Sequence, residues 1–277
     1  MSGRCFYVSS RGERHCLDGP GLRVGTANGL RGRKWTYSLG YRSASGISRD
    51  AREVEVDALF EDLSRADALR RAADRDVREG SPGAIEVDGA WTQRAMIVAS
   101  EVQTVFCGFM AATLTVLLLD GSWRREVVES FRPQPPSADE WLNFPHGYPY
   151  NYGGSQASAS IKVEGSGPAP ARIVVYGPAP SVDIGIGGNR YKVGAEVPPG
   201  SLLEIDGASF PKTIRLVGEY GDVSDRFSAG ERGLGEGSGD YVFQPLEPGA
   251  QAVSWDRSYG FDVHYFVEEG EPPWTSS

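Results

Sequence analysis

Residues that break regular secondary structure recur along the whole of this 277-residue chain, which contains 36 glycines and 18 prolines. Turn formers at such short intervals favour brief β-strands over long helices. Hydrophobic residues make up 40% of the chain, which is enough for a folded core. The length predicts one large or two ordinary domains, and neither needs metal or disulfide cross-links to be stable.

Acidic residues are concentrated in the second half of the chain. Residues 1–150 contain 19 Lys and Arg against 20 Asp and Glu, whereas residues 151–277 contain 9 against 17. This acidic half repels phosphate backbones, so we expect no nucleic-acid partner. The first residues lack an apolar signal-peptide core, and the longest apolar run, near 109–119, is far shorter than the ~20 residues that span a bilayer. We therefore expect synthesis in the cytoplasm, no standard secretion signal and no membrane insertion.

Alternating side chains in the first 132 residues predict a β-rich domain. In the segment 35–41 every second residue is bulky, so one face of an extended strand carries Trp35, Tyr37, Leu39 and Tyr41. Residues 52–60 alternate apolar and mostly acidic side chains, as a half-buried strand does. Further strands are expected at 84–87, from Trp91, at 113–119 and from Trp123, with tight turns at Asp88–Gly89 and Asp120–Gly121.

One helix is predicted in this domain, over about residues 64–78. Ser64 and Asp67 resemble a capping box at its start, and Gly80 and Pro82 end it. An i,i+4 ion pair is expected between Asp67 and Arg71. The apolar stripe that would face the sheet consists of Ala66, Leu69, Ala73 and, at its end, Val77.

A proline-rich segment, residues 133–158, separates the two halves. Proline cannot donate to a sheet ladder, so the five prolines between 133 and 149 argue against a central strand here. The segment also carries five aromatic residues, which favours an ordered linker that docks against a surface. We therefore predict an N-terminal domain over 1–132, a linker over 133–158 and a C-terminal domain over 159–277.

The C-terminal domain shows only strand signals. About eight short apolar runs, beginning near Ile161 and ending with FDVHYFV at 261–267, are separated by glycine and proline turns. Strands at this spacing without helices between them predict an antiparallel sandwich of jelly-roll or galectin-like size. One of the expected strands is the run DYVFQPL at 240–246.

No catalytic or metal-binding pattern emerges from the residue spacings. There is no G-x-S-x-G elbow, and the histidines His15, His146 and His264 are interpreted as strand or loop residues, although spacing alone leaves a triad open. No two histidines stand at metal-ligand spacing. A surface calcium site in the loops carrying Asp222, Asp225 and Asp240 stays open. We predict no catalytic, cofactor-binding or metal-binding residues and no enzyme activity.

Four smaller patterns receive structural interpretations. GIGGN at 185–189 lacks the lysine and the helix of a phosphate loop and reads as a hairpin turn. The carboxylates Glu268, Glu269 and Glu271 form a row rather than a pair opposed across a cleft, so we expect them in solvent. The three cysteines (Cys5, Cys16 and Cys107) are expected to be buried hydrophobes, with a Cys5–Cys16 bridge left open. Three aromatics could stack on a sugar, although packing in a core or interface is the favoured role: Trp255, Tyr259 and Trp274.

The order of these segments resembles the distal tail (Dit) protein family of siphoviruses. The N-terminal part of the resemblance is carried by 35–41, 52–60, the helix, SPGAIEVDG and LTVLLLDGSWRRE at 114–126. FPHGYPYNYG at 144–153 is similar to the aromatic linker of that family. The C-terminal part is carried by 171–193, SLLEIDG, 251–274 and the closing EGEPPW.

This resemblance implies a structural role in a phage or prophage virion. The N-terminal domain would form a homohexameric ring that links the tail tube protein to the tail-associated hub or fibre protein at the tail tip. The C-terminal galectin-like sandwich would face outward, toward a receptor-binding protein or a host glycan. Two alternatives remain at this point: a carbohydrate-binding module that contacts surface glycans, and a hydrolase with an unrecognised site.

Overall fold

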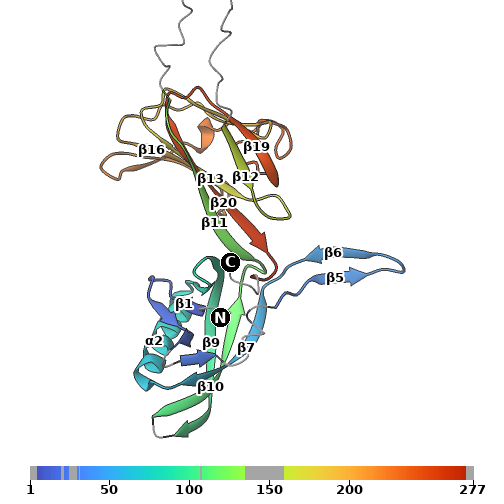
Figure 1. The fold of residues 1–277 in the computed structure, drawn as a ribbon, viewed down its shortest axis with the longest axis vertical. Helices are drawn as coiled ribbons and strands as arrows, with labels where there is room; N and C mark the ends of the chain where they lie inside the picture. The colour runs from blue at the N-terminus through green and yellow to red at the C-terminus, as the bar shows by residue number, and fades with distance from the viewer. Residues whose placement is uncertain are drawn as a thin grey trace, which may run out of the picture. The chain divides into compact units, whose positions relative to one another are not determined.

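The computed structural model describes residues 5–19, 22–24, 30, 32–106, 108–134 and 159–272. Over these residues the protein is mainly β, with antiparallel sheets and the long helix α2 (Leu63–Glu79) (Figure 1). The chain forms two compact units: unit 1 comprises 1–125 and 268–277, and unit 2 comprises 126–267. The predicted linker lies, beyond Gln134, outside the described residues. No helix in the described part of the chain is long and apolar enough to span a membrane.

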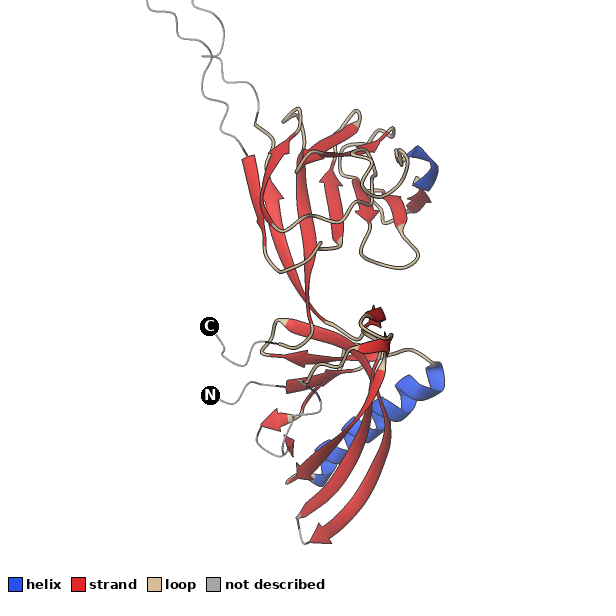
Figure 2. Ribbon diagram, turned by 90° about the vertical axis from the view of Figure 1, so that its right-hand side faces the viewer, coloured by secondary structure: helices blue, strands red, loops and turns tan. Residues whose placement is uncertain are grey.

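Unit 1 is built on one strongly curved antiparallel sheet. Its strands run in the order β2, β1, β8, β9, β10, β7, β4, β3, and the start of β11 pairs with the start of β9. These strands are β1 (Cys5–Val8), β2 (Arg14–Cys16), β3 (Asp18–Gly19), β4 (Leu22–Val24), β7 (Arg52–Phe60), β8 (Gly83–Val87), β9 (Trp91–Phe106), β10 (Phe109–Leu118) and β11 (Trp123–Phe131). Helix α2 crosses the face formed by β7 and β9 (Figure 2).

The predicted helix is confirmed, but its start differs from the prediction. Asp62 is the N-cap, and its carboxylate accepts hydrogen bonds from the Ser64 backbone N–H at 2.9 Å and the Ser64 hydroxyl at 2.6 Å. Ser64 therefore lies inside the first turn and the expected capping box was wrong. The predicted end is right, because Gly80 adopts the left-handed conformation that closes a helix.

The buried face of α2 also differs in part. Ala66, Leu69 and Ala73 are buried as predicted, but Val77 is exposed and the neighbouring Asp76 is buried in its place. A turn of 3.6 residues explains the change, since position 76 follows 69, 72 and 73 on the same face. Asp67 pairs with Arg70 at 2.9 Å rather than with Arg71.

Unit 2 contains two antiparallel sheets, each with one buried face. The first has the order β18, β17, β16, β13, β20, and the second has the order β12, β19, β14, β15. The strands are β12 (Ala159–Val163), β13 (Ala171–Tyr176), β14 (Val182–Ile186), β15 (Asn189–Val193), β16 (Leu202–Asp206), β17 (Thr213–Val217), β18 (Val223–Asp225), β19 (Gly249–Ser254) and β20 (Gly260–Glu269). Alternate residues of β13, β14 and β20 are buried, as the two-residue period of the sequence predicted.

Two tight turns predicted from the sequence are present. Asp88 and Gly89 have φ values of 55° and 72°, and Gly187 and Gly188 have φ values of 59° and 88°. Positive φ at both central residues is typical of the type I′ turn, whose twist matches that of paired strands. The segment at 185–189 is therefore a hairpin turn between β14 and β15, as predicted.

The strand expected at 240–246 was wrong. This segment forms a turn, with a single bridge between Leu246 and Ala169. Val242 and Phe243 are both buried although they are adjacent, which an extended strand on a two-layer core does not allow. The backbone N–H of Val242 donates to the Glu231 carbonyl at 3.0 Å, so it is paired with a loop rather than a ladder.

Candidate interaction surfaces

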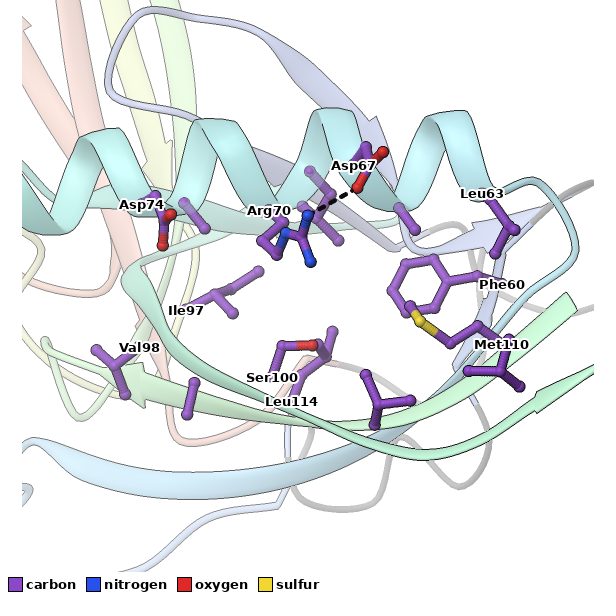
Figure 3. Close-up of a pocket in the computed structure, with 16 residues that line it drawn as sticks. Phe60, Leu63, Asp67, Arg70, Asp74, Ile97, Val98, Ser100, Met110 and Leu114 are labelled. Carbon is purple, nitrogen blue, oxygen red and sulfur yellow. Dashed lines mark hydrogen bonds and ion pairs between the residues drawn. The ribbon is translucent and has the colours of Figure 1, made fainter.

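An apolar groove of about 440 Å³ lies between α2 and the sheet of unit 1 (Figure 3). The helix supplies one wall, and strands β7, β9 and β10 supply the floor. Its apolar lining consists of Phe60, Leu63, Ala66, Leu69, Ala73, Ile97, Val98, Ala99, Val102, Val105, Met110 and Leu114. A concave apolar surface of this size on a folded unit is typical of a binding site.

Two bulges in β9 direct its side chains into the groove. Paired with β10, the ladder passes from Ile97 to Ala99 and from Val102 to Thr104, so Val98 and Gln103 are the extra residues. A bulge leaves one residue unpaired and re-aims those that follow. Val102 and Val105 are 53% and 63% exposed as a result. Phe106 and Phe109 follow at the hairpin tip, where their exposed rings stack at 5.1 Å outside the groove lining.

Two carboxylates and one guanidinium border the groove. Asp67 and Asp74 stand on the helix wall, and Arg70 between them pairs with Asp67 (Figure 3). Asp74 lies 3.9 Å from Arg78, and both side chains are more than half exposed. Asp67, Asp74 and Arg70 give the lining a formal charge of −1, which Arg78 beside Asp74 offsets.

The second surface is an arm formed by β5 (Thr36–Leu39) and β6 (Ala44–Ser48). The two strands pair with each other and, among the strands that the structure describes, with no other (Figure 1). The strand predicted at 35–41 is thus present, over 36–39. Every residue of both strands is exposed, and the large apolar side chains of the arm are Trp35, Tyr37, Leu39, Tyr41 and Ile47.

The composition of the arm suits it to docking. Isolated two-stranded ribbons are marginally stable in water, so an arm with five large exposed apolar residues gains most when a partner covers it. Residues 33–50 carry four basic side chains and one acidic side chain, Asp50. Arg49 lies over the ring of Trp35 at 4.7 Å, which places positive charge on an apolar surface.

A buried carboxylate fastens β1 and its turn to the helix. Asp76 is fully buried and accepts hydrogen bonds from the Tyr7 hydroxyl at 2.6 Å and the Ser10 hydroxyl at 2.5 Å. Burial and the adjacent carboxylate raise the pKa of Tyr7 well above its usual value. Burial also lowers the pKa of the nearby His15. This cluster holds the sheet edge against the far end of α2 and so stiffens the groove wall.

The histidines do not assemble into a triad among the described residues. His15 lies on β2 beside Glu13, whereas His264 lies on β20, where its Nδ1 is 2.7 Å from Glu126 Oε1. His146 falls outside the described residues. Arg172 also approaches Glu126, at 2.9 Å, so His264 belongs to a surface ion-pair cluster.

The three aspartates considered as a calcium site have other contacts, and one of them, Asp225, is the last residue of strand β18 rather than a loop residue. Asp225 accepts a hydrogen bond from the Phe227 backbone N–H at 2.8 Å, and Asp222 lies against Gly218 in its own turn. Asp240 lies against Gly233. The described residues contain no group of three or more ligand side chains that could hold a metal ion.

The remaining sequence candidates are dispersed. Glu268 pairs with Arg124 at 2.8 Å, so it is not simply solvated. Tyr259 is 2% exposed, so its ring has no accessible face on which a sugar could stack. The same burial raises the pKa of its hydroxyl to about 12. Trp255 packs edge-on against Phe131 and Phe261. Cys5 and Cys16 are not joined in a disulfide, and Cys107 and Trp274 lie outside the described residues.

Comparisons with known proteins show a similar fold but no protein of similar sequence. No family model matches the chain, and no curated protein matches it. Among solved structures it is similar to the Dit protein of phage SPP1, a hub of the adsorption apparatus, with 14% identity and a TM-score of 0.57. The match covers 97% of this chain and 100% of that one.

This chain has the Dit fold. Two structures of the phage P2 baseplate in its activated conformation, with calcium and with strontium, match with TM-scores of 0.60 and 0.59. Their identities are 12% and 11%, and each match covers 98% of this chain and 100% of the other. The resemblance that the order of the sequence segments indicated is therefore confirmed at the level of the fold. The apolar groove was missed, because bulges that aim side chains leave no periodic signal.

Proposed function

We propose that this chain is the structural distal tail protein, or baseplate hub, of a long-tailed siphovirus or prophage. The observation that carries the proposal is the likeness to the Dit fold over 97% of this chain and 100% of the SPP1 protein. A role in assembly, not catalysis, follows from this likeness, and the protein would reside in the virion at the tail tip.

The three sequence segments take separate tasks in this proposal. Residues 1–132 form the ring and contact the tail tube protein, and residues 133–158 act as the linker. Residues 159–277, as a galectin-like sandwich, face outward toward the tail-associated hub or fibre protein and a receptor-binding protein. The strand alternation on both sheets of unit 2 supports a sandwich.

The ring is proposed to close through the arm and the groove. In a heterologous interface each copy offers one surface and receives the other, and repeated rotation closes the ring, here near six copies. The arm supplies exposed Tyr37 and Leu39 and an excess of basic residues. The groove supplies exposed Val102 and Val105 and, on its helix wall, the carboxylates of Asp67 and Asp74. Apolar contact would supply most of the affinity, and charge would fix the orientation.

Paired variants test this arrangement. Leu39→Ser with Tyr37→Ser disables the arm, and Val105→Glu with Val102→Glu disables the groove. Wild-type protein should form rings near six copies in native mass spectrometry and negative-stain images, and each variant alone should be monomeric. Mixing the two variants should give heterodimers without rings, because one intact arm meets one intact groove. Tyr220→Ser, which changes a 92% exposed tyrosine of unit 2, is the control.

Rings that persist in the arm variant would refute the docking mode, and a wild-type chain that stays monomeric at tens of micromolar, even with tail tube protein added, would refute the hub assignment.

A second function, carbohydrate binding by unit 2, is favoured by one observation. A hollow lies beside Tyr176, the exposed aromatic residue of β13.

A further inference from the structure

The hollow in unit 2 lies beside Tyr176, at the end of β13. In the β13–β20 ladder Tyr176 is directly opposite Gly260, so β20 places no side chain beside the tyrosine ring at that position, whereas on its other side Tyr176 is paired with Leu202 of β16. The space beside it has a volume of about 340 Å³ and is closed on its other sides by Phe131, Pro133 and Pro178. A Cβ atom at Gly260 would lie 3.0 Å from Pro133 Cδ and 3.1 Å from the Phe131 carbonyl oxygen, so a side chain at this position would displace the segment 131–133 that walls the hollow.

The tyrosine is held in a fixed orientation with one side uncovered. Its hydroxyl donates a hydrogen bond of 2.6 Å to Asp262 Oδ2, on the neighbouring strand. The residue is nevertheless 43% exposed. An aromatic ring that is already immobilised loses little conformational entropy when a ligand stacks on it. The bond to Asp262 also raises the pKa of the Tyr176 hydroxyl above its ordinary value.

Polar groups converge on the same space. Asp262 lines the hollow, and one of its oxygens remains for a second donor after Tyr176 has used the other. Arg132 also lines it, and its guanidinium can donate hydrogen bonds to a ligand in the hollow. A small cavity with one aromatic wall, one carboxylate and one guanidinium is unlike the apolar groove of unit 1, so the two surfaces select different ligands.

We propose that this hollow is a subsite for one neutral pyranose ring of a polysaccharide. The axial C–H bonds of a pyranose carry partial positive charge and pack on the negative face of an aromatic ring. Its vicinal hydroxyls both donate and accept, as Asp262 and Arg132 require. The volume lies at the lower end of the range for small-molecule sites, which suits a single ring.

The charge of the surrounding chain selects against anionic sugars. Residues 151–277 carry 9 basic and 17 acidic side chains, so a phosphorylated or uronic acid polymer would be repelled. Within the hollow the charges of Asp262 and Arg132 balance. The assignment rests on the carbohydrate-binding function proposed for unit 2 and not on ring formation, because the hollow lies in unit 2 whereas the arm and the groove both lie in unit 1.

Saturation-transfer NMR on the full chain tests the site. The probes are D-glucose, D-galactose, L-rhamnose and N-acetyl-D-glucosamine at about 10 mM, with glucose 6-phosphate as the anionic comparison. We expect saturation of the ring protons for at least one neutral sugar. Tyr176→Ala should weaken that binding by about tenfold or more, and Tyr220→Ala, a matched change at a tyrosine outside the hollow, should leave it unchanged.

Tyr176→Phe keeps the ring, so it provides a second measurement if the alanine variant does not fold. It should retain binding with a loss of several-fold, because the ring is no longer fixed by Asp262. Absence of transfer to all four neutral sugars would overturn the proposal, as would tighter binding of glucose 6-phosphate. Equal binding by wild type and Tyr176→Ala would place any sugar elsewhere and would also overturn it.

Discussion

Replacing Asp76 by alanine should destabilise unit 1 by about 2–4 kcal/mol, although the residue belongs to none of the proposed contact surfaces. Its carboxylate is fully buried beneath the turn that follows β1. It accepts hydrogen bonds from the Tyr7 hydroxyl at 2.6 Å, the Ser10 hydroxyl at 2.5 Å and the Ser10 backbone N–H at 3.2 Å. A short polar side chain thus holds three donors from another element.

The magnitude follows from what each donor does when the acceptor is gone. Tyr7 is 0% exposed, so its hydroxyl would be left without a partner, at a cost of about 1–3 kcal/mol. Ser10 is exposed and regains water, so its bonds contribute only about 1 kcal/mol in total. Relief of the buried charge offsets part of this loss, which keeps the total below the ~3–5 kcal/mol of a broken buried ion pair.

Urea unfolding, combined with hydrogen exchange of the α2 amides, measures this loss in unit 1 alone. The control is Asp74→Ala on the same helix, where the side chain is 64% exposed and we expect a change within about 0.5 kcal/mol. In the double variant Tyr7→Phe with Asp76→Ala, the orphaned hydroxyl is absent, so part of the stability should return. An effect below about 1 kcal/mol, or no recovery in the double variant, would refute the reasoning.

Two further predictions concern buried aromatic side chains. Burial raises the pKa of Tyr7 and Tyr191, and raises that of Tyr259 from 10.0 to about 12. Folding favours the protonated form of each of these tyrosines, so each contributes to the free energy of unfolding below about pH 10. This contribution is lost as pH rises toward 12, by about 1.4 kcal/mol per pH unit for each tyrosine. Urea midpoints at about pH 9 and pH 11 should show the fall, and Tyr259→Phe should make it shallower; an unchanged slope contradicts the assignment. Trp255→Ala should destabilise unit 2 by about 2–3 kcal/mol, because it removes edge contacts to Phe131 and Phe261. Phe210→Ala, at a 99% exposed site, should change the unfolding midpoint little, and equal losses would contradict the packing role.

Much of the fold follows from local sequence signals. Helix α2 begins and ends within one residue of its predicted bounds of 64 and 78. The β7 strand has the predicted bounds of 52 and 60. The hairpin turns at 88–89 and 187–188 were also predicted, because positive φ at two successive residues restricts the sequence strongly. Short-range rules succeed where one backbone conformation is required by a few adjacent residues.

Other features depend on partners distant in sequence. Asp76 reads as one more polar residue of α2, and only contact with Tyr7, 69 residues away, explains its burial. The bulges at Val98 and Gln103 appear only when β9 is paired with β10. The hollow beside Tyr176 requires Gly260 to be opposite it, a register that neither strand specifies alone. The candidate sites are therefore products of pairing, not of motifs.

The arm shows a different limit of the same reasoning. The bulky residues Trp35, Tyr37 and Leu39 alternate with smaller ones in the way that normally indicates one buried face, yet this chain leaves both faces of β5 exposed. Bulky residues that alternate along a strand but contact nothing in their own chain are expected when another copy of the chain packs on them. The sequence is then adapted to the assembly and not to the free chain. The arm and groove variants test this explanation directly, because heterodimers from two monomeric variants require that the missing cover lie on a neighbour.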